Sequence, residues 1–263
     1  ASIQSNLNAR VVNKGLEFYF SHKNLNGKNL KWETTFNITF PKNVLTKFPD
    51  LEKSTYSNTY VIGKSTNIRR LYHYEGINPT TGLYTFSDTN NDGLINSKDR
   101  TIIKEMKTYW FGGIGNQLQF KNWSLDFLFQ ITKQQQSNLF AYEGYLGSMG
   151  NKSVAFLNYW TPTNIEATIQ KPSAGYSASA AAANAAFIQS DASVMNTYTV
   201  RLSNASLGYS ISKGFLGVDD ARIYLQGQNL LLLSNYKGID PEFSLAGYTG
   251  PMTVLSMGVN LKF

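Results

Sequence analysis

The chain has 263 residues, a formal net charge of +7 and no cysteine, with 14% aromatic and only 16% charged residues. This composition excludes a coiled coil or a disordered tail, and the lack of cysteine excludes disulfides, thiolate metal sites and a cysteine nucleophile. Lysine and arginine are spread thinly, with Arg69 and Arg70 as the only adjacent arginines, so nucleic-acid binding is not expected.

Strands are predicted along most of the chain, because apolar and polar residues alternate with the period of a half-buried strand. In the segment KNLKWETTFNITF, residues 28–40, one face collects Leu30, Trp32, Phe36, Ile38 and Phe40. The apolar phase changes within 197–211, which predicts a β-bulge near Ser203 and Asn204. We expect eight strands, at about 15–23, 28–40, 66–76, 107–120, 122–132, 197–211, 220–232 and 252–263.

Short and long connections are expected to alternate. The chain turns tightly at Phe120–Trp123, whereas the segment of about 134–196 separates two strands and forms a long loop. This loop contains SVAFLNYW and ASAAAANAAF, which predict short helices or irregular structure. We do not expect the loop to form a domain of its own.

Two architectures suit apolar-polar strands of this length. A soluble sandwich hides the apolar face inside but has strands of about five or six residues. A transmembrane barrel turns that face to lipid, needs about nine to eleven residues per strand, and has short turns at one end and long loops at the other. We therefore predict an all-β fold, a segment of a transmembrane antiparallel β-barrel. Trp32, Trp110 and Trp123 would suit its aromatic girdles, and a sandwich core is their alternative place.

Several strings occur together and in a fixed order between about Asn8 and Phe263: NKGLEFYF, KNLKWETTFNITF, YVIGKSTNIRRLYHYEGI, GGIGNQLQFKNWSLDFLFQ, LNYWTPTN, YTVRLSNASLGYSISK, RIYLQGQNLLLLSNYKGIDPE and SMGVNLKF. Taken together they resemble the C-terminal region of SusC/RagA-type TonB-linked outer-membrane transporters. The resemblance implies that residues 1–263 form about eight strands of a larger barrel of about 22 strands.

The resemblance also implies a function. The chain is expected to be part of a nutrient importer, for glycans, oligopeptides or similar substrates, in the outer membrane of a Gram-negative bacterium. The implied partners are the rest of the barrel and its plug, a SusD-like lipoprotein cap, TonB acting through an N-terminal part, and the lipid bilayer. Tyr142, Tyr145 and Tyr248 are candidates to contact substrate or cap, with ordinary loop packing as the alternative.

No catalytic set is found in the sequence, and no enzyme activity is expected. The two histidines, His22 and His73, lie far apart in sequence, and no nucleophile-elbow motif accompanies the serines. A second class of function fits the same composition: a soluble or surface-attached all-β calcium-binding adhesin or carbohydrate-binding module. Dependence on detergent distinguishes the two.

One polar stretch resembles a calcium-binding loop. In DTNNDGLINSKD, residues 88–99, the oxygen-bearing ligands of an EF-type loop would be Asp88, Asn90, Asp92, the carbonyl of Leu94 and Asp99. Aspartate in place of the usual glutamate at the last position shortens its reach. The alternative is a polar turn rich in Asn and Asp. The loop is expected to lead directly into the strand at 107–120, on the extracellular side, where Ca²⁺ is plentiful.

Overall fold

A computed structural model describes residues 7–174, 177–215, 218–243 and 250–262. Seven strands form one antiparallel sheet in the order β1-β2-β7-β8-β9-β10-β11. Its strands are β1 (Arg10–Asn26), β2 (Leu30–Lys47), β7 (Thr108–Phe120), β8 (Trp123–Ser137), β9 (Val194–Phe215), β10 (Val218–Ser234) and β11 (Val254–Lys262). Within the described residues the sheet does not close on itself, because β1 and β11 are its two edges.

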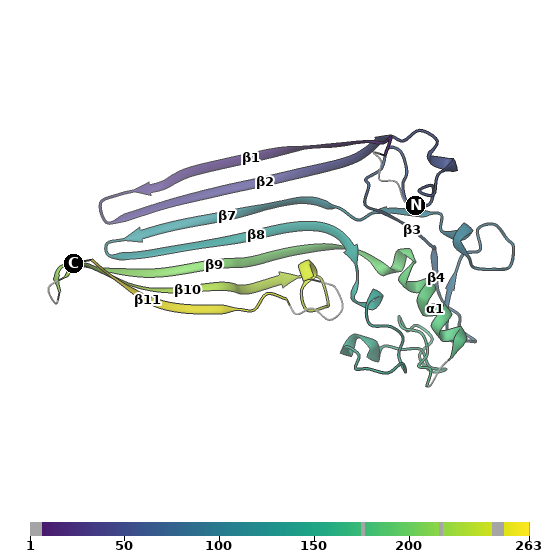
Figure 1. Cartoon of the computed structure of the whole chain (residues 1–263). Helices are drawn as coiled ribbons and strands as arrows, with labels where there is room; N and C mark the ends of the chain where they lie inside the picture. Colours follow the sequence, from purple (N-terminus) through teal and green to yellow (C-terminus); the bar gives the residue numbers. More distant parts are fainter. Residues whose placement is uncertain (1–6, 175–176, 216–217, 244–249, 263) are drawn as a thin grey trace, which may run out of the picture.

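The connections divide by length between the two ends of the sheet (Figure 1). Residues 27–29 and 121–122 form short hairpin turns at one end, and Lys121 has a φ of 51°, the left-handed conformation that two-residue hairpins favour. The segments 48–107 and 138–193 lie together at the other end. We call these two segments the loop assembly. The predicted alternation of short and long connections is therefore confirmed.

Strand register gathers the apolar residues on one side of the sheet. Residues directly opposite each other on neighbouring antiparallel strands point to the same side. One such row crosses all seven strands: Leu25, Trp32, Leu118, Leu125, Leu207, Leu225 and Met257. We call this side the outer face. Its apolar side chains are largely uncovered, with Met257 78% exposed and Leu125 37% exposed.

The opposite side, the inner face, is polar. The next row along the strands consists of Lys23, Glu33, Gln117, Asp126, Ser206, Gln226 and Ser256. Gly208 also lies on this face, where a Cβ atom would come within 2.6 Å of the Ser124 hydroxyl and 2.8 Å of the Arg222 guanidinium. Its glycine leaves room for the hydrogen bond that Arg222 donates to Ser124.

The bulge predicted in the strand at 197–211 is confirmed at Ser203. The neighbouring residues Leu128 and Phe129 of β8 pair with Asn204 and Leu202, so Ser203 has no partner on β8. This extra residue reverses the phase of the apolar residues along β9, which keeps both halves of the strand apolar on the outer face.

The segment expected as a strand at 66–76 does not join the sheet. It forms two short strands, β3 (Ile68–Leu71) and β4 (Tyr74–Ile77), which pair with β6 (Ile102–Glu105) and β5 (Tyr84–Phe86) inside the loop assembly. Arg69 helps to hold the segment there, because its guanidinium donates to the Ser137 hydroxyl at the end of β8 and to the Ile188 carbonyl of the second long loop.

Helical structure is brief and lies mainly in the loops. The alanine-rich stretch forms the α-helix, and SVAFLNYW contributes one of the 3₁₀ turns, as the sequence indicates. No helix in the described ranges has the length and hydropathy to cross a membrane. The helices are η1 (Leu51–Lys53), η2 (Ser97–Asp99), η3 (Leu139–Ala141), η4 (Val154–Leu157), α1 (Ala178–Ile188), η5 (Asp191–Ser193) and η6 (Pro241–Phe243).

The main hydrophobic core lies in the loop assembly. Tyr72, Tyr84, Phe86 and Phe187 are buried together, and the rings of Tyr84 and Phe187 stack with their centroids 4.4 Å apart. The first long loop supplies three of these residues and α1 supplies Phe187. The two loops therefore fold as one unit, held by contacts between residues about a hundred positions apart in sequence.

Candidate functional site

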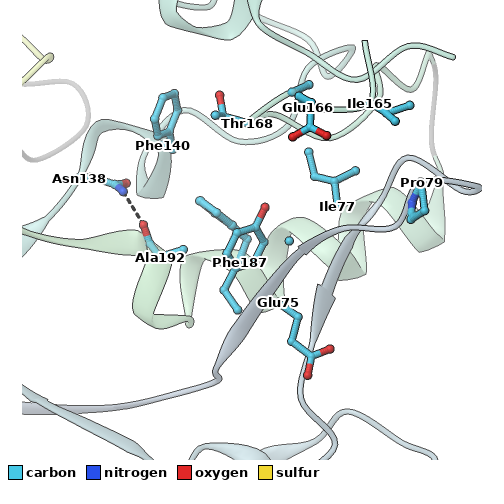
Figure 2. A pocket seen from close by; sticks show the side chains of 13 residues that line it. Glu75, Ile77, Pro79, Asn138, Phe140, Ile165, Glu166, Thr168, Phe187 and Ala192 are labelled. Atoms are coloured by element: carbon cyan, nitrogen blue, oxygen red, sulfur yellow. Dashed lines mark hydrogen bonds between the residues drawn. The ribbon is translucent and has the colours of Figure 1, made fainter. Parts of the chain in front are cut away.

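A cavity of about 600 Å³ opens in the loop assembly beside this core (Figure 2). Its walls come from β4, from the start of the second long loop, from residues 165–168 and from the end of α1. Asn138 fixes one wall, because its side-chain amide donates to the Ala192 carbonyl at 2.7 Å. The principal lining side chains are Tyr74, Ile77, Phe140, Ile165, Glu166 and Phe187.

The lining is mainly apolar and aromatic with few polar groups. In Figure 2 the side chain of Phe187 lies below Phe140, Ile77 and Glu166, while Glu75 points away from them. Burial raises the pKa of Tyr74 to about 12, so its phenol stays neutral at physiological pH. A concave surface of this composition suits the binding of an amphipathic molecule.

The tyrosines proposed from the sequence lie elsewhere. Tyr142 follows η3 and lies near Arg69 and Tyr236, and Tyr145 accepts a hydrogen bond from Ser148 through its carbonyl. Neither lines the cavity, and Tyr248 lies outside the described residues. Their contact with substrate stays a prediction. No sequence motif singles out the lining residues Phe140, Ile165 and Glu166, so the sequence alone does not predict them.

The loop at 88–99 is held by hydrogen bonds within itself. The Asp88 carboxylate accepts from the backbone N–H groups of Asp92 and Gly93, at 3.3 and 2.8 Å. The Asp92 carboxylate accepts from the Leu94 N–H at 3.0 Å and from the Asn90 side-chain amide at 2.8 Å. These are contacts of an Asx-rich turn, and they curl the chain around its carboxylates.

Asp99 joins the two ends of this loop. Its buried carboxylate accepts from the Asn96 N–H at 2.9 Å and from both the N–H and the hydroxyl of Thr89, at 2.9 and 3.1 Å. The hydrogen bond from Asn96, followed by those from Thr89, lowers the pKa of Asp99 because it stabilises the charged form. Asn96 and Asp99 form a capping box on η2, a role that the sequence N-x-x-D signals.

Two observations concern this loop and its position in the chain. Across the described residues, no group of three or more His, Cys, Asp or Glu side chains is arranged to hold a metal ion. The loop also leads into β6 and only then into β7, not directly into the strand at 107–120. Calcium binding by Asp88, Asn90, Asp92, Leu94 and Asp99 stays a prediction.

Comparisons with known proteins agree with the two-faced sheet. No family model matches the chain. It is 26% identical over 297 residues to TonB-dependent receptor P3 of Formosa agariphila and 28% identical over 298 residues to TonB-dependent receptor SusC of Bacteroides thetaiotaomicron. These alignments cover 96% and 99% of this chain. The solved structure of the RagAB peptide transporter matches 97% of the chain with a TM-score of 0.72 at 21% identity, which shows a shared fold.

The resemblance to SusC/RagA-type transporters is confirmed. The all-β fold class is confirmed with it, and the sheet described above is a segment of such a barrel that is not closed. The chain spans less than a third of the length of its SusC-like relatives, 29% of receptor P3 and 28% of SusC.

Proposed function

We propose that this chain is part of the barrel wall of a TonB-dependent nutrient importer in the outer membrane of a Gram-negative bacterium. The observation that supports this most strongly is the sheet with two unlike faces, an apolar row and a polar row that each cross strand after strand. Lipid on the outer face would cover the exposed apolar side chains, and the inner face would line a hydrated lumen.

The loop assembly would lie on the extracellular side and help to receive the substrate. Glycans, oligopeptides or similar nutrients are the proposed cargo, and a SusD-like lipoprotein is the proposed cap above the loops. The cavity lined by Phe140 and Glu166 offers apolar and acidic groups in this position. The relatives are more than three times longer than the matched region, so we assign the plug and the contact with TonB to regions outside it. No catalytic role is proposed.

The alternative, a soluble calcium-binding adhesin or carbohydrate-binding module, needs a second layer over the outer face. In the described residues the core lies in the loop assembly, and the outer face carries side chains such as Phe18 at 57% exposure and Met257 at 78%. Apolar exposure on this scale is a membrane or partner surface in a stable protein.

Fractionation of cells that make the protein tests the proposal. The protein should sediment with outer membranes, resist extraction by high salt and alkaline carbonate, and enter solution only with detergent, because lipid covers the outer face. Recovery as a monodisperse soluble protein without detergent would contradict the barrel and favour the soluble module.

A further inference from the structure

The outer face has a gap at its loop end, between β2 and β7. The two strands pair from Leu30 opposite Phe120 to Thr39 opposite Phe111 and then separate. Beyond that point Leu45 exchanges backbone hydrogen bonds with Gly63 and Lys64, both at 2.8 Å, in place of β7. Pro41 lies where the separation begins, and proline has no N–H to offer a neighbouring strand.

A cavity of about 730 Å³ fills this gap. Asn43 closes one side of it by accepting hydrogen bonds from the backbone N–H and the hydroxyl of Thr66, at 2.8 and 2.9 Å. Among its lining side chains are Lys14, Phe40, Lys42, Lys107, Thr108 and Tyr109. The lining thus includes three lysines together with the aromatic residues Phe40 and Tyr109.

Two of these lysines form an unusual pair. Lys14 and Lys42 are directly opposite each other on β1 and β2, so both point to the outer face with their Cβ atoms about 5 Å apart. Neither forms an ion pair within the part of the chain that the structure describes. Like charges in this arrangement repel each other, and a bound anion would remove the repulsion.

The positive charge continues across the gap onto β7 and β8. Tyr109 is the extra residue of a bulge in β7, and its ring lies 5.3 Å from the Lys107 ammonium and 5.2 Å from the Lys133 ammonium. Glu105, 3.0 Å from Lys107, is the only acidic residue in the cavity lining. The net charge around the cavity is therefore positive.

Apolar surface adjoins this charge on the outer face. Phe40 lies in the cavity two residues before Lys42, and its row continues into Leu16 of β1, which is 65% exposed. Lysines at a membrane boundary often only extend their ammonium groups into water. The concave lining, the two opposing lysines without an ion pair among the described residues and the adjoining apolar surface favour a more specific ligand with an anionic head and an apolar tail.

We propose that the gap between β2 and β7 binds the phosphate headgroup of an anionic membrane lipid, held by Lys14, Lys42 and Lys107, with an acyl chain along Phe40 and Leu16. This inference rests on the proposed function, because it needs the outer face to be in lipid. The lipid would fill a stretch where β2 and β7 do not pair, and so would stabilise the wall at its loop end.

The test uses the transporter purified from its membrane and returned to nanodiscs of phosphatidylcholine with or without phosphatidylglycerol. Phosphatidylglycerol should bind in native mass spectrometry and raise the unfolding temperature. Lys14→Gln with Lys42→Gln should weaken this binding about 30-fold, since each basic residue near a lipid surface contributes about a factor of five. Lys42→Arg should retain it. Lys28→Gln with Lys121→Gln, an equal charge change in the turns at the opposite end, is the matched control.

Three results would overturn the proposal: equal binding by the Lys14/Lys42 variant and the control, no preference for phosphatidylglycerol over phosphatidylcholine, or an equal rise in unfolding temperature with inorganic phosphate alone. Failure of the proposed function looks different, because the protein would then not insert into nanodiscs at all.

Discussion

The sheet and the loop assembly both contain many aromatic residues, but these side chains are exposed in the sheet and buried in the loop assembly. In the loop assembly, Tyr72, Phe86 and Phe187 are at most 8% exposed and pack on one another. In the sheet, aromatic residues such as Phe18 and Trp123 are 57% and 48% exposed and form a layer one residue deep. The loop assembly carries its own core, whereas the sheet needs its surroundings to cover it.

This difference decides where each region obtains its stability. The loop assembly gains from apolar burial inside the chain. The sheet gains from backbone pairing between strands, and lipid would complete it because water is a poor partner for the outer face. Substitutions that remove a side chain should therefore harm the loop assembly most, and substitutions that add charge should harm the outer face most.

Removal of the Phe187 ring should have the largest effect. Phe187→Ala should destabilise the loop assembly by about 3–5 kcal/mol, because it leaves a cavity among Tyr72, Tyr84 and Phe86. Hydrogen exchange in the loops of the detergent-purified protein would measure this. Phe18→Ala on the exposed outer face is the matched control and should change loop exchange little. Equal effects of the two substitutions would remove the distinction between the regions.

A charge on the outer face should have the next largest effect. Phe127→Arg should cost about 2–4 kcal/mol, because position 127 is the fifth residue of β8 from the short turn and a membrane-spanning strand needs about nine to eleven residues, so the proposed barrel would place it near the membrane centre. Gln117→Arg, which adds the same charge to the inner face, should cost much less. Folding yield into lipid vesicles across a urea series gives both values, and a similar loss for the two variants would contradict a lipid-facing outer face.

The alternation of apolar and polar residues in the sequence predicts much of the organisation of the sheet. Alternation of Trp123, Leu125 and Phe127 predicts the outer face, and the phase change near Ser203 predicts the bulge. Both are local signals, since a strand has a period of two wherever it lies.

The loop assembly depends on contacts between residues far apart in sequence, and the alternation of apolar and polar residues does not predict such contacts. Tyr84 and Phe187 meet across about a hundred residues, so alternation around 66–76 could not indicate that this segment joins β6 and α1 rather than the sheet. The cavity beside Phe140 and the gap at Pro41 depend on the same long-range contacts. The sequence therefore predicts the wall better than the site.

Acid should loosen the loop at 88–99 without changing the sheet. The folded pKa of Asp99 is lowered, so its carboxylate contributes stability above the usual pKa of aspartate, and this contribution is lost as the pH falls through the lowered value. Exchange of the Thr89 and Asn96 amides, corrected for its intrinsic pH dependence, should rise in that window. Asp99→Asn should abolish the pH dependence and Asp126→Asn should not. A loop that stays protected in acid would show that the carboxylate is not needed.

Calcium should have the smallest effect on the fold. Titration calorimetry of the unmodified protein should show one site with a Kd of about 0.1–1 mM, in the range of extracellular calcium modules. Asp88→Ala with Asp92→Ala should abolish the binding and leave the barrel inserted, and Asp126→Ala should retain the binding. If neither calorimetry nor anomalous scattering detects an ion at millimolar Ca²⁺, the loop is an Asx-rich turn alone.

The outer face of the sheet should meet lipid and the inner face should meet water. Spin labels at Phe127 and at the adjacent Asp126, in the transporter reconstituted into vesicles, test it most directly, because neighbouring positions on β8 point to opposite faces. The label at position 127 should relax strongly with oxygen and weakly with an aqueous nickel complex, and the label at 126 should do the reverse. Equal accessibility of the two positions to both relaxants would contradict the barrel.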